Sequence, residues 1–204
     1  FLLFFMDCIH SSISRHVKMN INGTPKNDLD QIAIQCYEML KKTYLNEYSD
    51  IMNLFYGMYI SVIESMETGA VQSIKPESFF VLDVPVADNA RAFQTLYDCM
   101  DHYTKPEILD GDNAWFNEKT GQKEGVKKQI RFWNFPQIVV ITLNRFTPDG
   151  SGKVNNNIMF PLDDLDLTKY ACGYRASTYK YELYGICNHI GGVTGGHYTA
   201  FVRN

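Results

Sequence analysis

Residues 181–203 read YELYGICNHIGGVTGGHYTAFVR, and this stretch decides more about the fold than any other part of the chain. The apolar and β-branched residues on either side of the glycines predict two strands, over residues 179–189 and 197–203. Four glycines lie between them, in the loop 190–196, so the backbone there can adopt positive φ and approach another extended chain closely. The stretch therefore predicts a hairpin whose second strand begins at His197.

His197 stands at the mouth of this glycine-rich loop. An imidazole in such a place can act as a general base or a general acid near neutral pH. Taken alone, however, a histidine beside a glycine turn is more often structural. The role of His197 therefore has to be judged together with the rest of the chain.

The first part of the chain carries helical signals. Thr24 can accept hydrogen bonds from free amides, Pro25 suits the first helical position, and apolar side chains then recur close to every 3.6 residues. The predicted helices cover residues 1–18, 25–45, 48–57 and 90–102.

Strand signals dominate the remainder. Besides the hairpin, the predicted strands cover residues 79–84, 128–135 and 138–146. Turns and polar loops are predicted at residues 68–75, 147–157, 149–150 and 191–192. Helices first and an antiparallel sheet later make this an α+β protein, read here as one compact unit.

The composition excludes several classes of function. The 19 Lys and Arg residues are scattered, whereas nucleic-acid binding needs a clustered basic face. The apolar stretches 1–6 and 51–63 are shorter than the roughly 20 residues that cross a bilayer. The 5 cysteines form no C-x-x-C pair, which argues against a disulfide framework and favours the cytoplasm or nucleus.

The string 181–203 resembles the histidine box of the ubiquitin-specific proteases, a papain-like family of cysteine proteases, and Gly196 to Val202 match that box at every position. Three upstream stretches resemble further boxes of the family, in the same order: residues 105–113, 135–146 and 158–167. The resemblance covers about Asn27 to the end. It implies a papain-like cysteine protease fold, with thumb helices and an antiparallel palm and finger sheet.

On this resemblance, residues 1–204 are one partial catalytic domain. The thumb helices would occupy residues 1–57, the fingers and connecting elements 58–135, and the palm with the histidine box 136–204. The family's nucleophile lies in a G-N-T-C box, and its third catalytic residue follows the histidine box; neither has a counterpart here. We therefore expect a domain that is incomplete at both ends and inactive as a fragment.

The family nucleophile has one N-terminal candidate in this chain, Cys8. It lacks the preceding Gly-Asn-Thr and lies too close to Asp28 for the family spacing. We expect Cys8 instead to be a small buried hydrophobic residue. Cys36 and Cys99 lie on apolar helical faces and are expected in the core.

The resemblance assigns His197 the role of catalytic base and acid. It also implies that Gly195, Gly196 and Tyr198 contact the substrate, ubiquitin, whose tail ends Leu-Arg-Gly-Gly. The walls of the narrow approach would be the loops 190–196 and 147–157.

At the other end of the tail, the family's Q-D-A-x-E-F box pairs with the arginine. Residues 27–32 align with this box, although only Asp28 is identical; the alignment implies substrate contacts for Asn27, Asp28 and Gln31. Gln31 replaces the acid, and Asp30 on a neighbouring face is a substitute. The alternative is a capped amphipathic helix start with no substrate role.

Many members of the family hold zinc with two C-x-x-C pairs. The second pair aligns with Asn117 and Thr120, and the first falls where Glu64 and Glu67 stand, so we expect no metal and no cofactor. The remaining histidines have no partner at metal spacing. We expect structural or solvated roles for His10, His16 and His102, and support of the glycine-rich loop from His189.

The leading hypothesis is a thiol-dependent deubiquitinase that hydrolyses the isopeptide or peptide bond after the C-terminal glycine of ubiquitin. Its nucleophilic cysteine would lie outside these residues, and its partners would be ubiquitin or ubiquitinated proteins, without nucleic acid or membrane. The alternative is a catalytically inactive, ubiquitin-binding scaffold. A third reading is an unrelated β-rich binding domain.

Overall fold

A computed structural model describes residues 1–147, 149–174 and 179–204 of the chain. The chain forms two compact units, each built from separate stretches of sequence. Unit 1 comprises Phe1–Phe80, Lys105–Val140 and Tyr170–Ala176, and unit 2 comprises Val81–Thr104, Ile141–Lys169 and Ser177–Asn204. The sequence-based division into thumb, fingers and palm stays a prediction.

The helices of unit 1 lie in the first part of the chain, as predicted. They are α1 (Leu2–Ile13), α2 (Asp28–Asn46) and α3 (Asp50–Phe55). The predicted helix start at Thr24 and Pro25 is wrong. Helix α2 begins three residues later because Asn27 Oδ1 accepts a hydrogen bond from Asp30 N at 2.8 Å, which caps the first turn.

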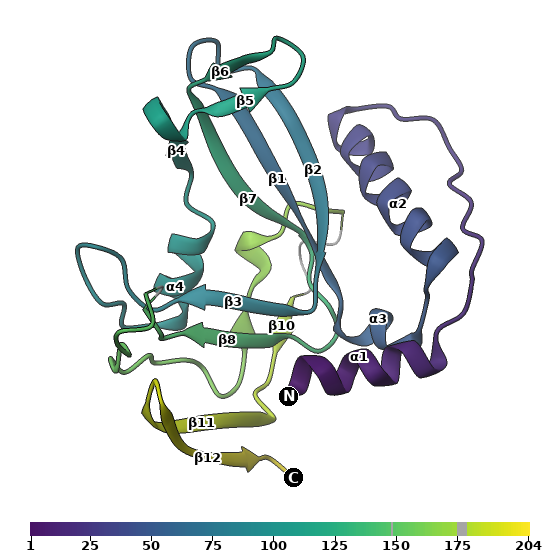
Figure 1. Ribbon diagram of the computed structural model, residues 1–204. Coiled ribbons are helices and arrows are strands. Elements are labelled where there is room, and N and C mark those ends of the chain that lie inside the picture. Colours follow the sequence, from purple (N-terminus) through teal and green to yellow (C-terminus); the bar gives the residue numbers. More distant parts are fainter. Residues whose placement is uncertain (148, 175–178) are drawn as a thin grey trace. The chain divides into compact units, whose positions relative to one another are not determined.

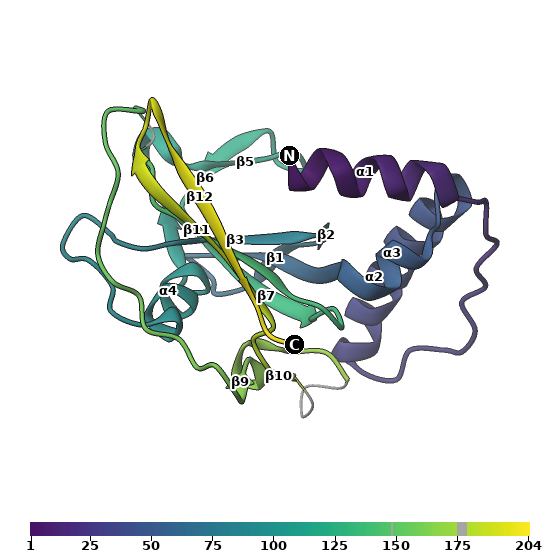
Figure 2. The ribbon, with the colours of Figure 1, turned by 90° about the horizontal axis from the view of Figure 1, so that it is seen from below.

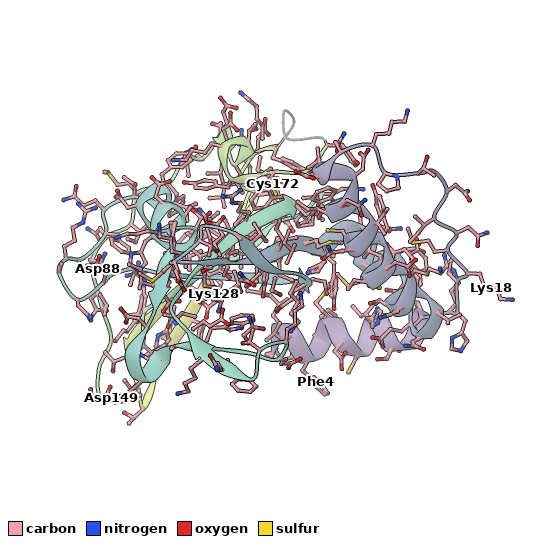
Figure 3. The ribbon with its side chains drawn as sticks, turned by 90° about the horizontal axis from the view of Figure 1, so that it is seen from above. Phe4, Lys18, Asp88, Lys128, Asp149 and Cys172 are labelled. Carbon is pink, nitrogen blue, oxygen red and sulfur yellow. The ribbon has the colours of Figure 1, made fainter. Side chains whose placement is uncertain are left out.

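Helix α1 contacts α3 (Figures 1 and 2). Its one buried residue is His10, whose Nδ1 lies 2.7 Å from Ser49 Oγ, the hydroxyl of the N-cap residue of α3. The connection to α2 carries the exposed Lys18 (Figure 3) and is tied down where Arg15 N donates to Tyr48 O at 2.8 Å. His10 therefore has the structural role expected of it.

The central sheet of unit 1 is antiparallel, with the strand order β2-β1-β7-β4 (Figure 1). Its strands are β1 (Gly57–Ser65), β2 (Val71–Phe79), β4 (Glu107–Leu109) and β7 (Val126–Asn134). The sequence predicted β7 but missed β1, and it placed a loop over much of β2. Pro76 is tolerated within β2 because β2 is an edge strand.

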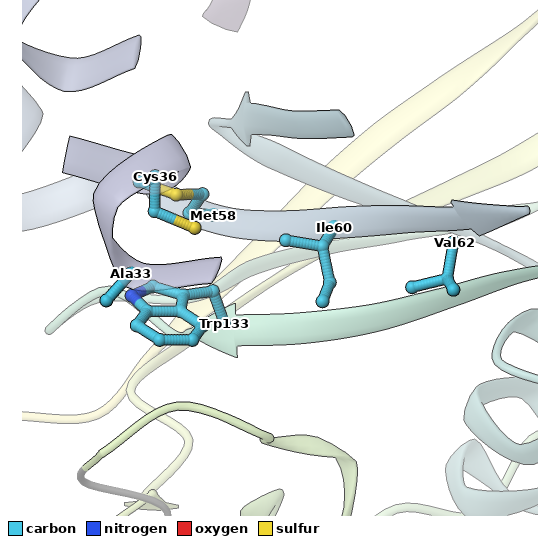
Figure 4. Packing of buried hydrophobic residues seen from close by; sticks show 6 residues of the cluster. All are labelled: Ala33, Cys36, Met58, Ile60, Val62 and Trp133. Atoms are coloured by element: carbon cyan, nitrogen blue, oxygen red, sulfur yellow. The ribbon is translucent and has the colours of Figure 1, made fainter. Parts of the chain in front are cut away.

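Helix α2 packs its apolar face on this sheet. Figure 4 shows the cluster: Ala33 and Cys36 from α2, Met58, Ile60 and Val62 from β1, and Trp133 from β7. The i, i+3 spacing on the helix and the alternation along the strand place these side chains on facing surfaces. Cys36 is fully buried, which raises the pKa of its thiol to about 12 and confirms it as a core residue.

Two short elements complete unit 1. The hairpin of β5 (Trp115–Asn117) and β6 (Gln122–Glu124) follows a single 3-10 turn, η1 (Gly111–Asn113).

Unit 2 pairs β3 (Val81–Pro85) with β8 (Val140–Asn144) and β9 (Leu165–Asp166) with β10 (Lys180–Tyr181). Helix α4 (Leu96–Tyr103) begins later than predicted, because Thr95 and Asp98 form a capping box in front of it. The 3-10 turn η2 (Thr168–Tyr170) follows β9, with Tyr170 already in unit 1. Cys99 is fully buried on α4, as predicted, and burial raises the pKa of its thiol to about 11.

The C-terminal hairpin of unit 2 consists of β11 (Gly185–Gly192) and β12 (Gly195–Val202), which run side by side in Figure 2. The strand predicted over 179–189 is thus two strands, β10 and the first part of β11. Among the described residues, no helix is long and apolar enough to cross a membrane.

Candidate active site

His197 lies on the exposed hairpin of unit 2, near the start of β12. The strands stay paired up to Gly192 and Gly195, so Val193 and Thr194 form the turn that was predicted at residues 191–192. His197 is paired with Ile190, which is 66% exposed. Within the described residues the His197 ring has no hydrogen-bond partner, so both ring nitrogens are available to a reacting group.

The opposite face of the hairpin is occupied by His189, whose ring centroid lies 4.6 Å from that of its cross-strand partner Tyr198. A Cβ atom at Gly196 would lie 2.2 Å from His189 Nε2 and 2.5 Å from Ile190 O. Only glycine therefore leaves room for this ring beside β12. His189 supports the hairpin, as expected, while Tyr198 remains 67% exposed.

The segment 149–157 is fixed at its C-terminal end by Arg145. The guanidinium donates to Val154 O at 3.1 Å and to Asn156 O at 2.7 Å. Asn156 Nδ2 in turn donates to Val86 O and Phe93 O. The C-terminal part of the predicted wall 147–157 is thus held by charge-assisted and amide hydrogen bonds. Pro148 of this wall lies outside the described residues.

The second predicted substrate contact lies in unit 1, at the start of α2. Asn27, Asp28 and Gln31 are all exposed, and the side-chain oxygen of Asn27 is used as the helix cap. The geometry fits the alternative interpretation of a capped helix start, and the substrate role stays a prediction. This set and the His197 set belong to different compact units of the chain.

Asp30 already has partners of its own. Its carboxylate accepts hydrogen bonds from the Tyr174 hydroxyl and, at 2.8 Å, from Lys26 N. The Tyr174 bond, followed by the Lys26 bond, lowers the pKa of Asp30, and the same Tyr174 bond raises the pKa of Tyr174 to about 12. An incoming arginine would have to share this carboxylate.

We expect Asn27→Ala to destabilise the first turn of α2 by about 1 kcal/mol, because Asp30 N loses its acceptor. Faster amide exchange at Asp30, measured in the complete protein, would report the loss. Asn27→Ser retains a capping oxygen and serves as the control. Equal protection in both variants would contradict the capping role.

The residues that align with the second C-x-x-C pair of the zinc-binding members, Asn117 and Thr120, lie in a hydrogen-bonded hairpin. Asn117 is 4% exposed, and its amide donates to Glu124 Oε1 at 2.9 Å, as does the Thr120 hydroxyl. Neither side chain can supply a thiolate, so these residues do not fit a four-cysteine zinc site. Within the described residues there is no group of three or more His, Cys, Asp or Glu that could hold a metal ion.

Cys8 is exposed on α1, so the expectation that it is buried is wrong. The buried residue of this helix is His10. Cys187 on β11 is exposed as well, and the thiol pKa of Cys172 is raised by burial.

The family model for ubiquitin carboxyl-terminal hydrolases matches residues 1–204. Ubiquitin carboxyl-terminal hydrolase 2 of Homo sapiens is 33% identical over 209 residues, which cover 100% of this chain and 34% of that protein. Ubiquitin carboxyl-terminal hydrolase Usp2 of Drosophila melanogaster is 30% identical over 212 residues, covering 100% of this chain and 21% of that protein. The match includes Phe1, so it covers more of the chain than the resemblance found from the sequence, which began near Asn27.

Solved structures show the same fold. A SAGA DUB module with Ubp8, Sgf11, Sus1 and Sgf73 has a TM-score of 0.70 at 24% identity, over 99% of this chain and 41% of that chain. A second structure of that module, bound to monoubiquitin, has a TM-score of 0.64 at 26% identity, over 85% of this chain and 39% of that chain. These likenesses confirm the predicted α+β, papain-like fold class.

Proposed function

Because this chain belongs to the ubiquitin carboxyl-terminal hydrolase family, we propose that the complete protein is a thiol-dependent deubiquitinase. It hydrolyses the isopeptide or peptide bond after the C-terminal glycine of ubiquitin. The observation that carries the proposal is the family match over residues 1–204 together with an exposed His197 at the start of β12. The chain spans only 34% of the length of the human relative. We expect the nucleophilic cysteine of the complete protein to lie outside residues 1–204.

In this proposal, a cysteine thiolate attacks the carbonyl carbon of the last glycine of ubiquitin, and His197 has accepted the thiol proton. The bond between that carbon and the lysine nitrogen breaks, and His197 gives its proton to the leaving amine. A water molecule then attacks the thioester, with His197 as base. The products are the free carboxylate of ubiquitin, the free amine and the restored thiol.

Gly195, Gly196 and Tyr198 are the proposed contacts to the substrate tail on β12. A tail that ends in two glycines can approach closely where the protein side also lacks side chains. Gly195 supports this role, since a Cβ there would point into open space, where a substrate has room.

Asp28 is the proposed acid for the arginine of the tail, since the Asp30 carboxylate already accepts hydrogen bonds from the Tyr174 hydroxyl and Lys26 N. Asp28→Ala in the complete protein tests this contact. Weaker ubiquitin binding would support it, and unchanged binding would support the capped helix start with no substrate role.

The proposal is tested by exposing the complete protein to ubiquitin with a cysteine-reactive group at its C-terminus. We expect a covalent adduct that prior thiol alkylation prevents, and we expect mass mapping to place it outside residues 1–204. Within the chain, the thiols of Cys36 and Cys99 are buried and have raised pKa values, which disfavours the thiolate. An adduct at Cys8 or Cys187 would contradict this assignment of the nucleophile.

The same experiment decides the alternative function. A complete protein that binds ubiquitin but forms no adduct would be the ubiquitin-binding scaffold. Without binding or adduct, the likeness would extend to the fold alone. We also place the protein in the cytoplasm or nucleus, which the free state of its cysteines supports.

A further inference from the structure

The ammonium group of Lys153 lies against the turn end of β11. Its Nζ donates to His189 O at 2.9 Å and to Gly191 O at 3.2 Å, and it lies 3.0 Å from His189 Nδ1. An ammonium group has three hydrogens and no acceptor. The three contacts therefore use its full donor capacity, and His189 Nδ1 must be the acceptor, with the ring proton on Nε2.

The main chain of Lys153 belongs to the segment 149–157, so its side chain links that segment to β11. Lys153 forms a bridge with Phe146, and Val154 N donates to Arg145 O at 2.7 Å. The Phe146 ring also lies 5.8 Å from Lys153 Nζ and 5.9 Å from the His189 ring. The main chain of Lys153 is thus held beside residues 145 and 146, and its ammonium group is held by β11.

The link acts on the residues that the proposed function uses. His189 packs against Gly196 and Tyr198 on β12, directly beside His197 in sequence. Gly191, whose carbonyl Lys153 holds, is paired with Gly196 and has a φ of +140°. Removing the ammonium would leave two carbonyls and a ring nitrogen without this donor, at the glycine-rich end of the hairpin.

We propose that Lys153 is a positioning residue that latches the segment 149–157 to β11 and so holds the turn in front of His197 in register for the substrate tail. This inference rests on the proposed function for its kinetic consequence, but not for its structural one. Lys153 acts through His189 and Gly191 and touches no reacting atom.

The test is Lys153→Met in the complete protein, which keeps the length of the side chain and removes the charge. We expect KM for a ubiquitin substrate to rise about tenfold with kcat nearly unchanged, as for the loss of a charge-assisted hydrogen bond that serves binding. Loss of folded protein would instead lower the apparent kcat and leave KM unchanged. Lys153→Arg, which retains the donors, is expected to restore part of the loss.

Amide exchange provides a readout that needs no activity. We expect residues 190–196 to exchange faster in Lys153→Met than in the wild type, and the control Lys18→Met, at an exposed lysine of unit 1 (Figure 3), to change nothing there. Unchanged exchange at residues 190–196 would overturn the latch. If the wild type cleaves no ubiquitin substrate, the proposed function fails, while the exchange result still decides the latch.

Discussion

His197→Ala is expected to lower kcat/KM of the complete protein for a ubiquitin substrate by roughly a thousandfold, within the range of about 10² to 10⁴ for a lost general base. The variant keeps the cysteine but leaves its thiol without the base that activates it. Because the His197 ring is exposed and has no hydrogen-bond partner among the described residues, its removal should leave the fold unchanged. The loss should therefore fall on kcat, with ubiquitin affinity preserved.

Three measurements separate a catalytic role of His197 from a structural one. Thermal unfolding of His197→Ala should coincide with that of the wild type, and the affinity for ubiquitin should be the same. Added imidazole should restore part of the rate, since a free base can enter the space that the side chain left. A variant that retains activity within tenfold of the wild type would remove His197 from the mechanism.

The elements that sequence reasoning identified well are those whose signal is local and continuous. Strands β7, β8 and β12 each carry an unbroken run of strand-forming residues. The catalytic role of His197, which rests on one such continuous string, stays a prediction. Strand β2 lacks such a run, since an edge strand that contains Lys75, Pro76 and Glu77 resembles a polar loop. The sequence pattern alone could not distinguish the two.

Other features depend on partners distant in sequence. Lys153 contacts His189, 36 residues away, and nothing around a lysine in a polar loop indicates such a partner. The prediction of where α2 begins failed for a different reason. Thr24 and Asn27 are both good N-cap residues, and only the path of the main chain selects Asn27. The substrate role of Asn27, Asp28 and Gln31 rests on one identical residue, which is too little to separate a binding box from a helix cap.

Gly196→Ala is the second change with a large expected effect. The new methyl group would lie 2.2 Å from His189 Nε2 and 2.5 Å from the main-chain oxygen of Ile190. The carbonyl cannot rotate away without breaking the pairing of β11 with β12, so we expect the hairpin to lose about 1 to 3 kcal/mol of stability. Displacing His197 by about 1 Å would in addition cost roughly a hundredfold in kcat/KM.

Gly195→Ala is the matched control, because it adds the same methyl group one residue earlier. No atom lies within 4 Å of a Cβ placed there. Amide exchange in β11 and β12 should increase in Gly196→Ala and stay as in the wild type in Gly195→Ala. If Gly195→Ala nevertheless loses activity, the methyl group must obstruct the substrate, since the fold is unchanged, and this would support a narrow approach for the tail. Equal exchange in the two variants would contradict the close packing of His189 on Gly196. The pair thus separates the need for glycine in the fold from the need for glycine in recognition.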